Sequence, residues 1–260
     1  MAVDLDGKPN DLPFFSLSVR FLFVRSHSLA KMSDDFVPDF ITKERANEKQ
    51  KKTIVPLKQF VIEQPITPIE HPLEYTYVFS YFVRPGGKFD PEEYANYVQP
   101  VASFSSVEQF WNTYRFIKRP SDINEKVDFH MFKKGIKPVW EDEANKKGGK
   151  WILRLKKGLS SRYWENLLLA MIGEQFLVGE EICGAVCSVR NQEDILSLWN
   201  RTANNAGVTN RIRDTLRRIL NLPGNAILEY KRHDDCLKDQ SSYRHTHTHT
   251  SNNAVPAWYR

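Results

Sequence analysis

The chain has 260 residues and a formal net charge of +5 at pH 7, and hydrophobic residues make up 41% and charged residues 27% of it. This composition excludes a chain that is disordered throughout and a collagen-like fibre, and three cysteines are too few for a disulfide scaffold. No apolar run reaches the ~18 residues of a membrane-spanning helix, and the odd number of cysteines favours free thiols in a reducing compartment. We therefore expect a cytoplasmic protein without membrane contacts.

The chain divides by composition into three parts. Residues 1–70, which contain several prolines and the polar run KERANEKQKK, are predicted to be a largely disordered extension. The apolar segment 12–24 does not resemble a signal peptide, because acidic residues precede it and Arg20 interrupts it. Residues 71–238 are predicted to form one folded domain, and residues 239–260, with their alternating histidines, a disordered low-complexity tail.

Strand and helix patterns alternate through the predicted domain. Residues 74–83, rich in aromatic and β-branched residues, are typical of a strand. Residues 105–117 have helical periodicity, and Ser105 and Glu108 would form a capping box at their start. The elements predicted next are a strand at 150–157, a helix at 161–176, strands at 182–190 and 194–199, a helix at 211–220 and a strand at 226–231. We therefore expect an α+β domain with a mainly antiparallel sheet backed by helices.

The positive charge is concentrated in the predicted domain. Residues 1–70 contain 10 basic and 10 acidic residues, whereas residues 131–157 contain nine basic and three acidic ones. A second group of four arginines lies between Arg211 and Arg218. Such clusters favour an anionic partner such as phosphate or nucleic acid. A solvated lysine surface would give the same pattern, so charge alone does not decide between them.

Motifs of common enzymes are absent from the sequence. It contains no P-loop, no dinucleotide-binding glycine pattern, no nucleophile elbow and no His-Glu-x-x-His zinc motif. Cys183 and Cys187 lack a second pair that would complete a zinc site. Glu141 and Asp142 are adjacent, which makes them a weak general acid and base pair. We therefore expect no enzymatic activity, no metal ion and no cofactor.

Trp140 has surroundings unlike those of a core residue. It lies in GIKPVWEDEANKKGGK, a segment of charged residues, proline and glycine, whereas Trp151 and Trp164 have apolar neighbours. A large aromatic side chain in such a segment either folds back over the core or stacks on a ligand. With Glu141 beside it and lysines nearby, the segment offers a ring, a double hydrogen-bond acceptor and phosphate ligands. This combination suits a guanine nucleotide, whose N1–H and N2–H₂ groups form a pair of donors.

Six segments between residues 71 and 238 match, in order, those of a known family. They are HPLEYTYVFSYF (71–82), SVEQFW (106–111), FKKGIKPVWEDEANKKGGKW (132–151), GEEICGAVCSVR (179–190), LSLWN (196–200) and IRDTLRRILNLP (212–223). Together they resemble the cap-binding eukaryotic translation initiation factor 4E family. The resemblance is to its second class, the 4E-homologous proteins, because Tyr77 and Tyr94 stand where the general factors carry tryptophans. It implies a curved sheet with about three helices on its convex face and a cap pocket on its concave side.

The resemblance also implies how the 7-methylguanosine cap of messenger RNA would bind. The positively charged base would lie between Trp140 and Tyr94, and would gain about 0.5–2 kcal/mol of cation–π attraction from each desolvated ring. Phe89 or Tyr97 could replace Tyr94, because the preceding loop varies in length. Glu141 would accept the two hydrogen bonds from the Watson–Crick edge of guanine.

Three further residues complete the implied cap site. Trp199 would pack near the N7 methyl group, although a tryptophan on a strand belongs by default to the core. Arg190 would hold the triphosphate with help from Lys150, unless the two are ordinary surface charges. The general factors carry a lysine five residues after Arg190, where this chain has Ile195. We therefore expect weaker cap binding than in the general factors.

A second surface, on the helical side, is implied as a docking site for partner proteins. Such partners would carry a Tyr-x₄-Leu-apolar motif on a short helix that lies in a groove. The matching residues are His71, Pro72, Val107, Trp111, Leu169 and Gly173. Trp111 could instead be entirely buried. The general factors have a glutamate where this chain has Asn166, so the choice of partner is expected to differ.

These features suit a monomer that competes for capped messenger RNA. A weak cap binder with altered partner contacts would occupy caps without recruiting the ribosome, and would repress translation of selected messages. The alternative is an accessory initiation factor that recruits a scaffold protein to the cap. An interaction domain with a non-functional cap pocket, or a cap-processing enzyme, would also fit the charge pattern and has less support from the motifs.

Overall fold

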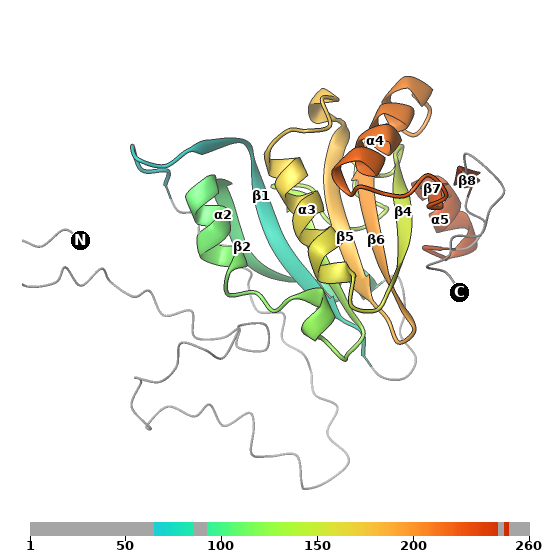
Figure 1. Ribbon diagram of the computed structural model, residues 1–260, viewed down its shortest axis with the longest axis horizontal. Helices are drawn as coiled ribbons and strands as arrows, with labels where there is room; N and C mark the ends of the chain where they lie inside the picture. Colours follow the sequence, from blue (N-terminus) through green and yellow to red (C-terminus); the bar gives the residue numbers. More distant parts are fainter. Residues whose placement is uncertain (1–64, 86–92, 244–246, 250–260) are drawn as a thin grey trace, which may run out of the picture.

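The computed structural model describes residues 65–85, 93–243 and 247–249. These residues form one curved antiparallel sheet of eight strands in the order β2-β1-β3-β5-β6-β4-β7-β8 (Figure 1). The strands are β1 (Pro72–Val83), β2 (Gln99–Ser106), β3 (Val127–Lys133), β4 (Gly149–Lys156), β5 (Ile182–Val189), β6 (Glu193–Asn200), β7 (Leu228–Arg232) and β8 (His247–His249). The sheet confirms the α+β class, while residues 1–64 of the predicted extension lie outside the described residues.

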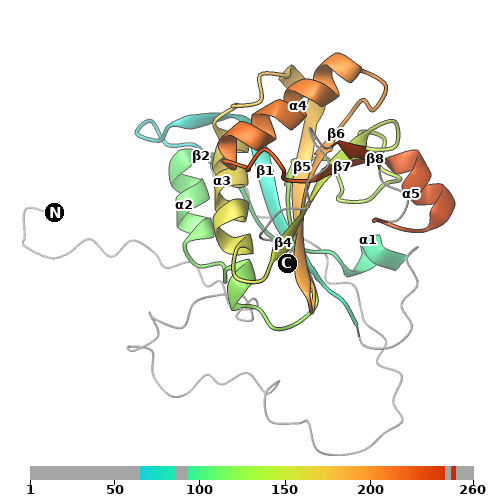
Figure 2. The ribbon, with the colours of Figure 1, turned by 45° about the vertical axis from the view of Figure 1, so that its right-hand side comes forward.

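Helices lie on both sides of this sheet. Three of them, α2 (Val107–Tyr114), α3 (Ser160–Ile172) and α4 (Ala206–Ile219), cover one face (Figures 1 and 2). Two shorter ones, α1 (Tyr94–Tyr97) and α5 (His233–Asp239), lie on the other side (Figure 2). The helical segments also include two 3₁₀ turns, η4 (Pro120–Asp122) and η5 (Gly179–Glu181). The three longer helices correspond to those predicted from helical periodicity.

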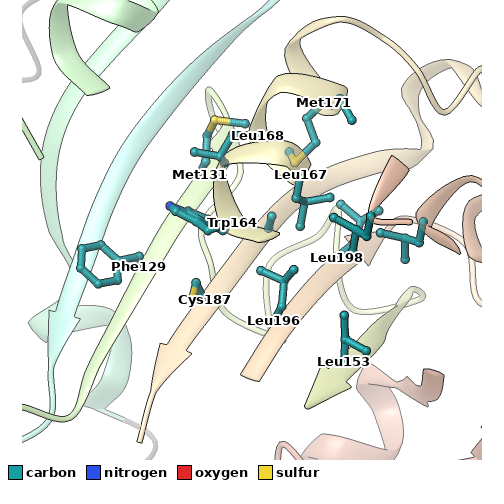
Figure 3. Packing of buried hydrophobic residues seen from close by; sticks show 14 of the residues in the cluster. Phe129, Met131, Leu153, Trp164, Leu167, Leu168, Met171, Cys187, Leu196 and Leu198 are labelled. Carbon is teal, nitrogen blue, oxygen red and sulfur yellow. The ribbon is translucent and has the colours of Figure 1, made fainter. Parts of the chain in front are cut away.

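The core lies between the longer helices and the sheet. In α3 the large buried residues Trp164, Leu167, Leu168 and Met171 recur at the spacing of one helix face. They pack against alternate residues of the strands, such as Phe129 of β3 (Figure 3). Because successive side chains of a strand point to opposite faces, the intervening strand residues are left for the other face of the sheet.

The start of α2 differs from the predicted capping box by one residue. Ser106 is the N-cap, and its Oγ accepts a hydrogen bond from the backbone N–H of Gln109 at 3.1 Å. The Gln109 side chain accepts from the backbone N–H of Ser105 at 3.0 Å. Glu108 instead accepts from the backbone N–H of His71 at 2.9 Å. The prediction was wrong because β2 extends to Ser106, so that Ser105 belongs to the strand.

Within the predicted domain, residues 71–238, the strands β2 and β3 were not predicted. The sequence of β2, QPVASFSS, is too polar to stand out, and that of β3, VDFHMFK, carries Asp128 and His130 between apolar residues. Both polar residues of β3 are nonetheless buried, at 4% and 0% exposure. The alternation of apolar and polar residues along β3 predicts one buried face, and could not show that the face with Asp128 and His130 is covered as well.

The described structure continues beyond residue 238, the expected end of the folded domain. The backbone oxygen of Ser241 accepts a hydrogen bond from Lys231 Nζ at 2.9 Å. Further along, β8 pairs with β7 in antiparallel register. Part of the segment expected to be a disordered tail therefore lies against the sheet.

Candidate functional site

The face of the sheet opposite α2, α3 and α4, here called the concave face, carries side chains in rows. Directly paired residues of neighbouring strands share a face. One row consists of Phe82, Asp128, Ser188, Ile195 and Arg154, the next of Ser80, His130, Val186, Ser197 and Ile152, and the third of Val78, Phe132, Gly184, Trp199 and Lys150. The register thus brings residues from β1, β3, β5, β6 and β4 together on one surface.

A first group on the concave face consists of Trp140, Trp199 and Lys150. Lys150 Nζ lies 5.6 Å from the ring centroid of Trp140 and 5.2 Å from that of Trp199. Burial lowers the pKa of Lys150 to about 8. Its ammonium group makes no hydrogen bond or ion pair with any of the described residues. A buried cation without a carboxylate partner, next to aromatic rings, is suited to bind an anion.

Trp199 is the most buried tryptophan of this group, at 4% exposure. Its ring contacts Phe132 edge to face at a centroid distance of 5.3 Å, and the ring of His233 of α5 lies 4.2 Å from it. Gly184 makes room for this packing, because a Cβ atom there would lie 2.3 Å from the Phe132 ring. Trp199 therefore belongs to a small apolar cluster on the concave face, which also contains Phe132 and Val186.

The loop before β4 holds Trp140 at the rim of the concave face. The amide of the fully buried Asn145 donates hydrogen bonds to the backbone oxygens of Lys137 and Val139, each at 2.8 Å. The carboxylate of Asp142 accepts from the backbone N–H of Lys137 at 3.0 Å. Glu141 is exposed and makes no hydrogen bond or ion pair in the part of the chain that the structure describes. Its carboxylate is therefore available to a ligand.

A second group contains Tyr94 and Arg190. The Tyr94 hydroxyl lies 2.7 Å from His130 Nε2 and 3.4 Å from Asp128 Oδ2. The same carboxylate pairs with Arg190, whose Nη2 lies 2.6 Å from Asp128 Oδ1. Burial and the negative charge of Asp128 raise the pKa of Tyr94, and its ring packs on Phe82 at a centroid distance of 4.5 Å. The two outer residues, Tyr94 and Arg190, were predicted from the sequence, whereas His130 and Asp128, which join them, were not.

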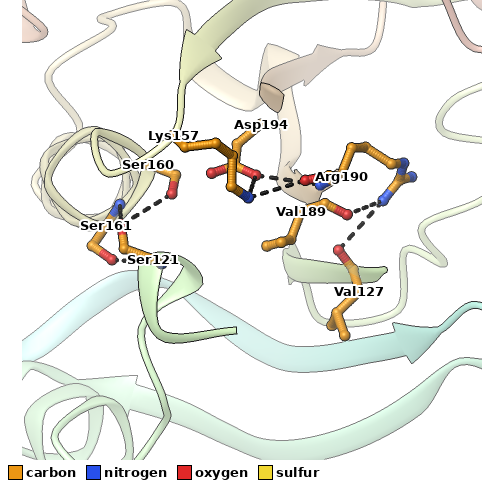
Figure 4. A network of polar contacts seen from close by, with 8 residues as sticks. All are labelled: Ser121, Val127, Lys157, Ser160, Ser161, Val189, Arg190 and Asp194. Atoms are coloured by element: carbon orange, nitrogen blue, oxygen red, sulfur yellow. Dashed lines mark hydrogen bonds and ion pairs between the residues drawn. The ribbon is translucent and has the colours of Figure 1, made fainter. Parts of the chain in front are cut away.

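The turn between β5 and β6 fixes the backbone of Arg190 (Figure 4). Asp194 is fully buried, and its Oδ1 accepts hydrogen bonds from Lys157 Nζ at 2.6 Å and from the backbone N–H of Arg190 at 3.3 Å. The Arg190 guanidinium donates from Nη1 to the backbone oxygen of Val189 at 2.8 Å. The guanidinium is therefore held beside the strand ends rather than extended into solvent.

Tyr243, which was not predicted from the sequence, lies between the two groups. Its hydroxyl lies 3.0 Å from Ser188 Oγ, and its ring centroid lies 5.1 Å from Lys150 Nζ. Burial, together with the negative charge of Asp128, raises the pKa of Tyr243 to about 12. In the sequence it is a single aromatic residue in a polar tail, and no local pattern distinguishes it.

A match to a known family model shows the family to which the chain belongs. Residues 72–248 match the family model described as eukaryotic initiation factor 4E. The chain belongs to the initiation factor 4E family. Eukaryotic translation initiation factor 4E-4 of Caenorhabditis elegans is 63% identical over 203 residues, which are 78% of this chain and 96% of that protein. Eukaryotic translation initiation factor NCBP of Oryza sativa subsp. japonica is 45% identical over 68% of this chain and 77% of that protein.

Solved structures of initiation factor 4E proteins share the fold. A complex of C. elegans eIF4E-3 with the 4E-binding protein Mextli and a cap analog has a TM-score of 0.61 at 37% identity, and the match covers 65% of this chain and 96% of that chain. A complex of Ascaris suum eIF4E-3 with the m7G cap has a TM-score of 0.60 at 38% identity, over 64% and 92% of the two chains. The named relatives are initiation factors, which confirms the expectation that the protein is not an enzyme.

The residues expected on the partner surface of this initiation factor 4E protein lie on the side of α2 and α3. Trp111 of α2 is 40% exposed and Leu169 of α3 is 36% exposed, so the alternative of a fully buried Trp111 is wrong. Pro72 and Gly173 are exposed and Val107 is half-buried. The imidazole Nδ1 of His71 lies 2.7 Å from Glu108 Oε1. These residues provide an accessible apolar surface.

Within residues 65–85, 93–243 and 247–249, no group of three or more His, Cys, Asp or Glu side chains is arranged to hold a metal ion. No helix of these ranges is long and apolar enough to cross a membrane.

Proposed function

We propose that this cytoplasmic protein binds the 7-methylguanosine cap of messenger RNA on its concave face and thereby regulates translation. The observation that carries the proposal is the convergence of Trp140, Trp199 and Lys150 with Tyr94 and Arg190 on one surface. Similar solved proteins contain a cap or a cap analog, which supports the choice of ligand.

In this proposal the base is recognised by Trp140, Glu141 and Tyr94. Trp140, held at the rim of the concave face, stacks on the cationic 7-methylguanine ring, and Tyr94 takes the opposite side. The unpaired carboxylate of Glu141 accepts the two hydrogen bonds of the guanine edge, a contact typically worth about 1–3 kcal/mol of base discrimination. Trp199 packs against the N7 methyl group of the base.

The triphosphate is bound by Lys150 and Arg190 in this proposal. Lys150 is buried without a carboxylate partner, and a phosphate would supply the counter-charge that its ammonium group lacks. Ile195 lies between Ser188 and Arg154 in the first row of the concave face. A lysine at that position would point at the same ligand, so its absence supports the expectation of weaker cap binding than in general factors.

We further propose that the protein acts as a monomeric competitor that represses selected messages. Support comes from Ile195 on the cap side and from Asn166 on α3. Each replaces a charged residue of the general factors, a lysine and a glutamate, and so removes a contact expected there with the cap or with a partner protein. Its partners would be proteins with a Tyr-x₄-Leu-apolar helix, which fits the exposed Trp111 and Leu169. The alternative is an accessory initiation factor, which the names of the relatives support.

A fluorescence titration tests the proposed ligand. Adding 7-methyl-GTP to the full chain should quench tryptophan fluorescence, whereas GTP should not, and Trp140→Ala and Glu141→Gln should each raise the Kd at least ~10-fold, about 1.4 kcal/mol. Glu143→Gln is the matched control, because Glu143 is an exposed carboxylate two residues after Glu141 and pairs with Lys146. A flat titration would contradict cap binding, and nucleotide turnover would indicate an enzyme.

A translation assay separates the two roles. In an extract programmed with a capped reporter, a competitor lowers reporter yield in proportion to added protein, and the Trp140→Ala variant does not. An accessory initiation factor would raise the yield. A reporter with an uncapped, cap-independent start is the control, and its yield should remain unchanged in both cases.

A further inference from the structure

A buried polar network lies at the β1–β3 side of the concave face and connects the two outer residues of the second group. It contains Ser80, His130 and Asp128 in addition to Tyr94 and Arg190. Ser80 and His130 are direct partners across β1 and β3, and Asp128 lies two residues before His130 on the same face. Their exposures are 8%, 0% and 4%, so the network is closed to solvent at its centre.

His130 is bonded on both sides. Its Nδ1 lies 3.2 Å from Ser80 Oγ, and its Nε2 lies 2.7 Å from the Tyr94 hydroxyl. Burial lowers the pKa of His130 to about 4, so the ring is neutral near pH 7. A neutral imidazole has one donor and one acceptor nitrogen, and the two hydroxyl groups satisfy both of them. The orientation of the Tyr94 hydroxyl is therefore fixed by a ring that cannot turn without losing a buried hydrogen bond.

Asp128 extends the network to Arg190. One carboxylate oxygen lies 2.6 Å from Arg190 Nη2, and the other accepts a hydrogen bond from the Tyr94 hydroxyl at 3.4 Å. The two oxygens of one carboxylate thus connect the ring proposed to stack on the base with the guanidinium proposed to bind phosphate.

The packing of the sheet does not itself call for polar side chains at these places. Val186, the direct neighbour of His130 in the same row, is apolar and equally buried at 6% exposure. Burying His130 and Asp128 requires a partner for each of them, because an unpaired buried polar group costs about 1–3 kcal/mol. The partners of His130 are two hydroxyl groups, and Asp128 has the ion pair with Arg190. A fully bonded buried network holds its members in one arrangement, and here it fixes the positions of the Tyr94 hydroxyl and the Arg190 guanidinium.

We infer that His130 and Asp128 are positioning residues for cap binding, and that they hold Tyr94 and Arg190 as one unit. His130 acts through the Tyr94 hydroxyl, and Asp128 acts mainly through Arg190. The inference rests on the proposed function, because it assigns no ligand contact to either residue and gives both a role only through residues proposed to bind the cap.

A double-mutant cycle on the full chain tests the role of His130. The variants are Tyr94→Phe, His130→Phe and the double variant, and the measured quantity is the Kd for 7-methyl-GTP. Each single change should raise the Kd roughly 3- to 10-fold, and the double change no further, because both remove the same hydrogen bond. His130→Gln, which keeps a polar atom near the position of Nε2, should restore part of the loss. Additive effects of the two single changes would overturn the inference.

A comparison of ligands tests the role of Asp128. Asp128→Asn should reduce the Kd for 7-methylguanosine divided by the Kd for 7-methyl-GTP. Without its ion pair to Asp128, the Arg190 guanidinium is less well positioned, so its contact with the phosphates contributes less to affinity. His130→Phe should leave this ratio within about twofold of the wild type, since it acts on the ring that stacks on the base. A general loss of structure would lower both affinities together in both variants, and that result would overturn the inference.

Two controls separate these outcomes from misfolding and from failure of the proposed function. Tyr163→Phe is the matched tyrosine control on α3, on the opposite face of the sheet, and Leu216→Ala on α4 is a destabilised control. Both should keep the wild-type Kd at a temperature where the proteins are folded. A wild type that does not bind 7-methyl-GTP refutes the proposed function, whereas a binding wild type with an additive cycle refutes this inference alone.

Discussion

At the scale of one residue, Lys150 suits ligand binding but lowers the stability of the fold. It is 2% exposed, it lies directly across from Lys231 in the sheet, and three aromatic rings surround its ammonium group. Lys231 has a carboxylate partner, since its Nζ contacts Asp239 at 2.6 Å, and Lys150 has none among the described residues. Aromatic rings offset only part of the loss of hydration.

Replacing Lys150 by methionine should therefore stabilise the fold and weaken ligand binding. The pKa of Lys150 in the folded protein is about 8, below its usual 10.5. The unfolded chain thus binds this proton more tightly, so the penalty is complete below pH 8 and disappears as the pH rises to 10.5. Lys150→Met should raise the free energy of unfolding by roughly 1–3 kcal/mol at pH 7 and by much less at pH 10. Urea denaturation at the two pH values measures this.

The control for this experiment is Lys156→Met, because Lys156 is an exposed residue of the same strand. It should change the free energy of unfolding little at either pH. An equal gain for Lys150→Met at pH 7 and pH 10 would show that methionine stabilises by packing alone, and would contradict an electrostatic penalty.

At the scale of elements, α2 shows what local sequence predicts and where it stops. Its helical pattern and a serine at its start were visible in the sequence, but which serine is the cap depends on where β2 ends. The tertiary partner of Glu108 is equally invisible, since His71 lies 37 residues away in the chain. Similarly, β3 could not be predicted, because the burial of its polar residues depends on contacts with α1 and β5.

The capping geometry predicts different effects for two neighbouring serines. Ser106→Ala removes the acceptor for the backbone N–H of Gln109 and should lower the free energy of unfolding by about 1 kcal/mol. Ser105→Ala should cost less, because the shorter bond from Ser105 to the Gln109 side chain, at 3.0 Å, comes from its backbone N–H and remains in place. Only the longer bond from Ser105 Oγ, at 3.4 Å, is lost. Chemical denaturation of both variants measures the difference. A larger loss for Ser105→Ala would contradict the assignment of Ser106 as the cap.

At the scale of the whole molecule, the concave face contains residues of two kinds. Trp140 and Glu141 lie in one contiguous motif, so a resemblance to a family could identify them without a structure. Tyr243 and His130 have no such motif, and their places follow from the course of the tail and from strand register. Sequence therefore predicted the residues proposed to contact a ligand, and could not predict those that hold or cover them.

The position of Tyr243 predicts competition with a bound cap. Its ring lies beside Lys150, and its hydroxyl contacts Ser188 of β5, two residues before Arg190. A triphosphate that reaches Lys150 must displace this ring, which reduces the apparent affinity. Tyr243→Ala should lower the Kd for 7-methyl-GTP roughly 2- to 10-fold and speed association in stopped-flow fluorescence. A higher Kd would contradict this and would make Tyr243 a ligand contact.

The strand order also governs when this surface can form during synthesis. Among the described strands, β4 pairs only with β6 and β7, both of which are made later. While the ribosome is still making α3 and β5, the strand that carries Lys150 has two open edges and no neighbour. Pairings between distant segments are slow to form and leave unpaired strands open to aggregation. A nascent chain that stalls before β7 would therefore display the apolar side of β4 without a pocket, and would be a natural client for chaperones.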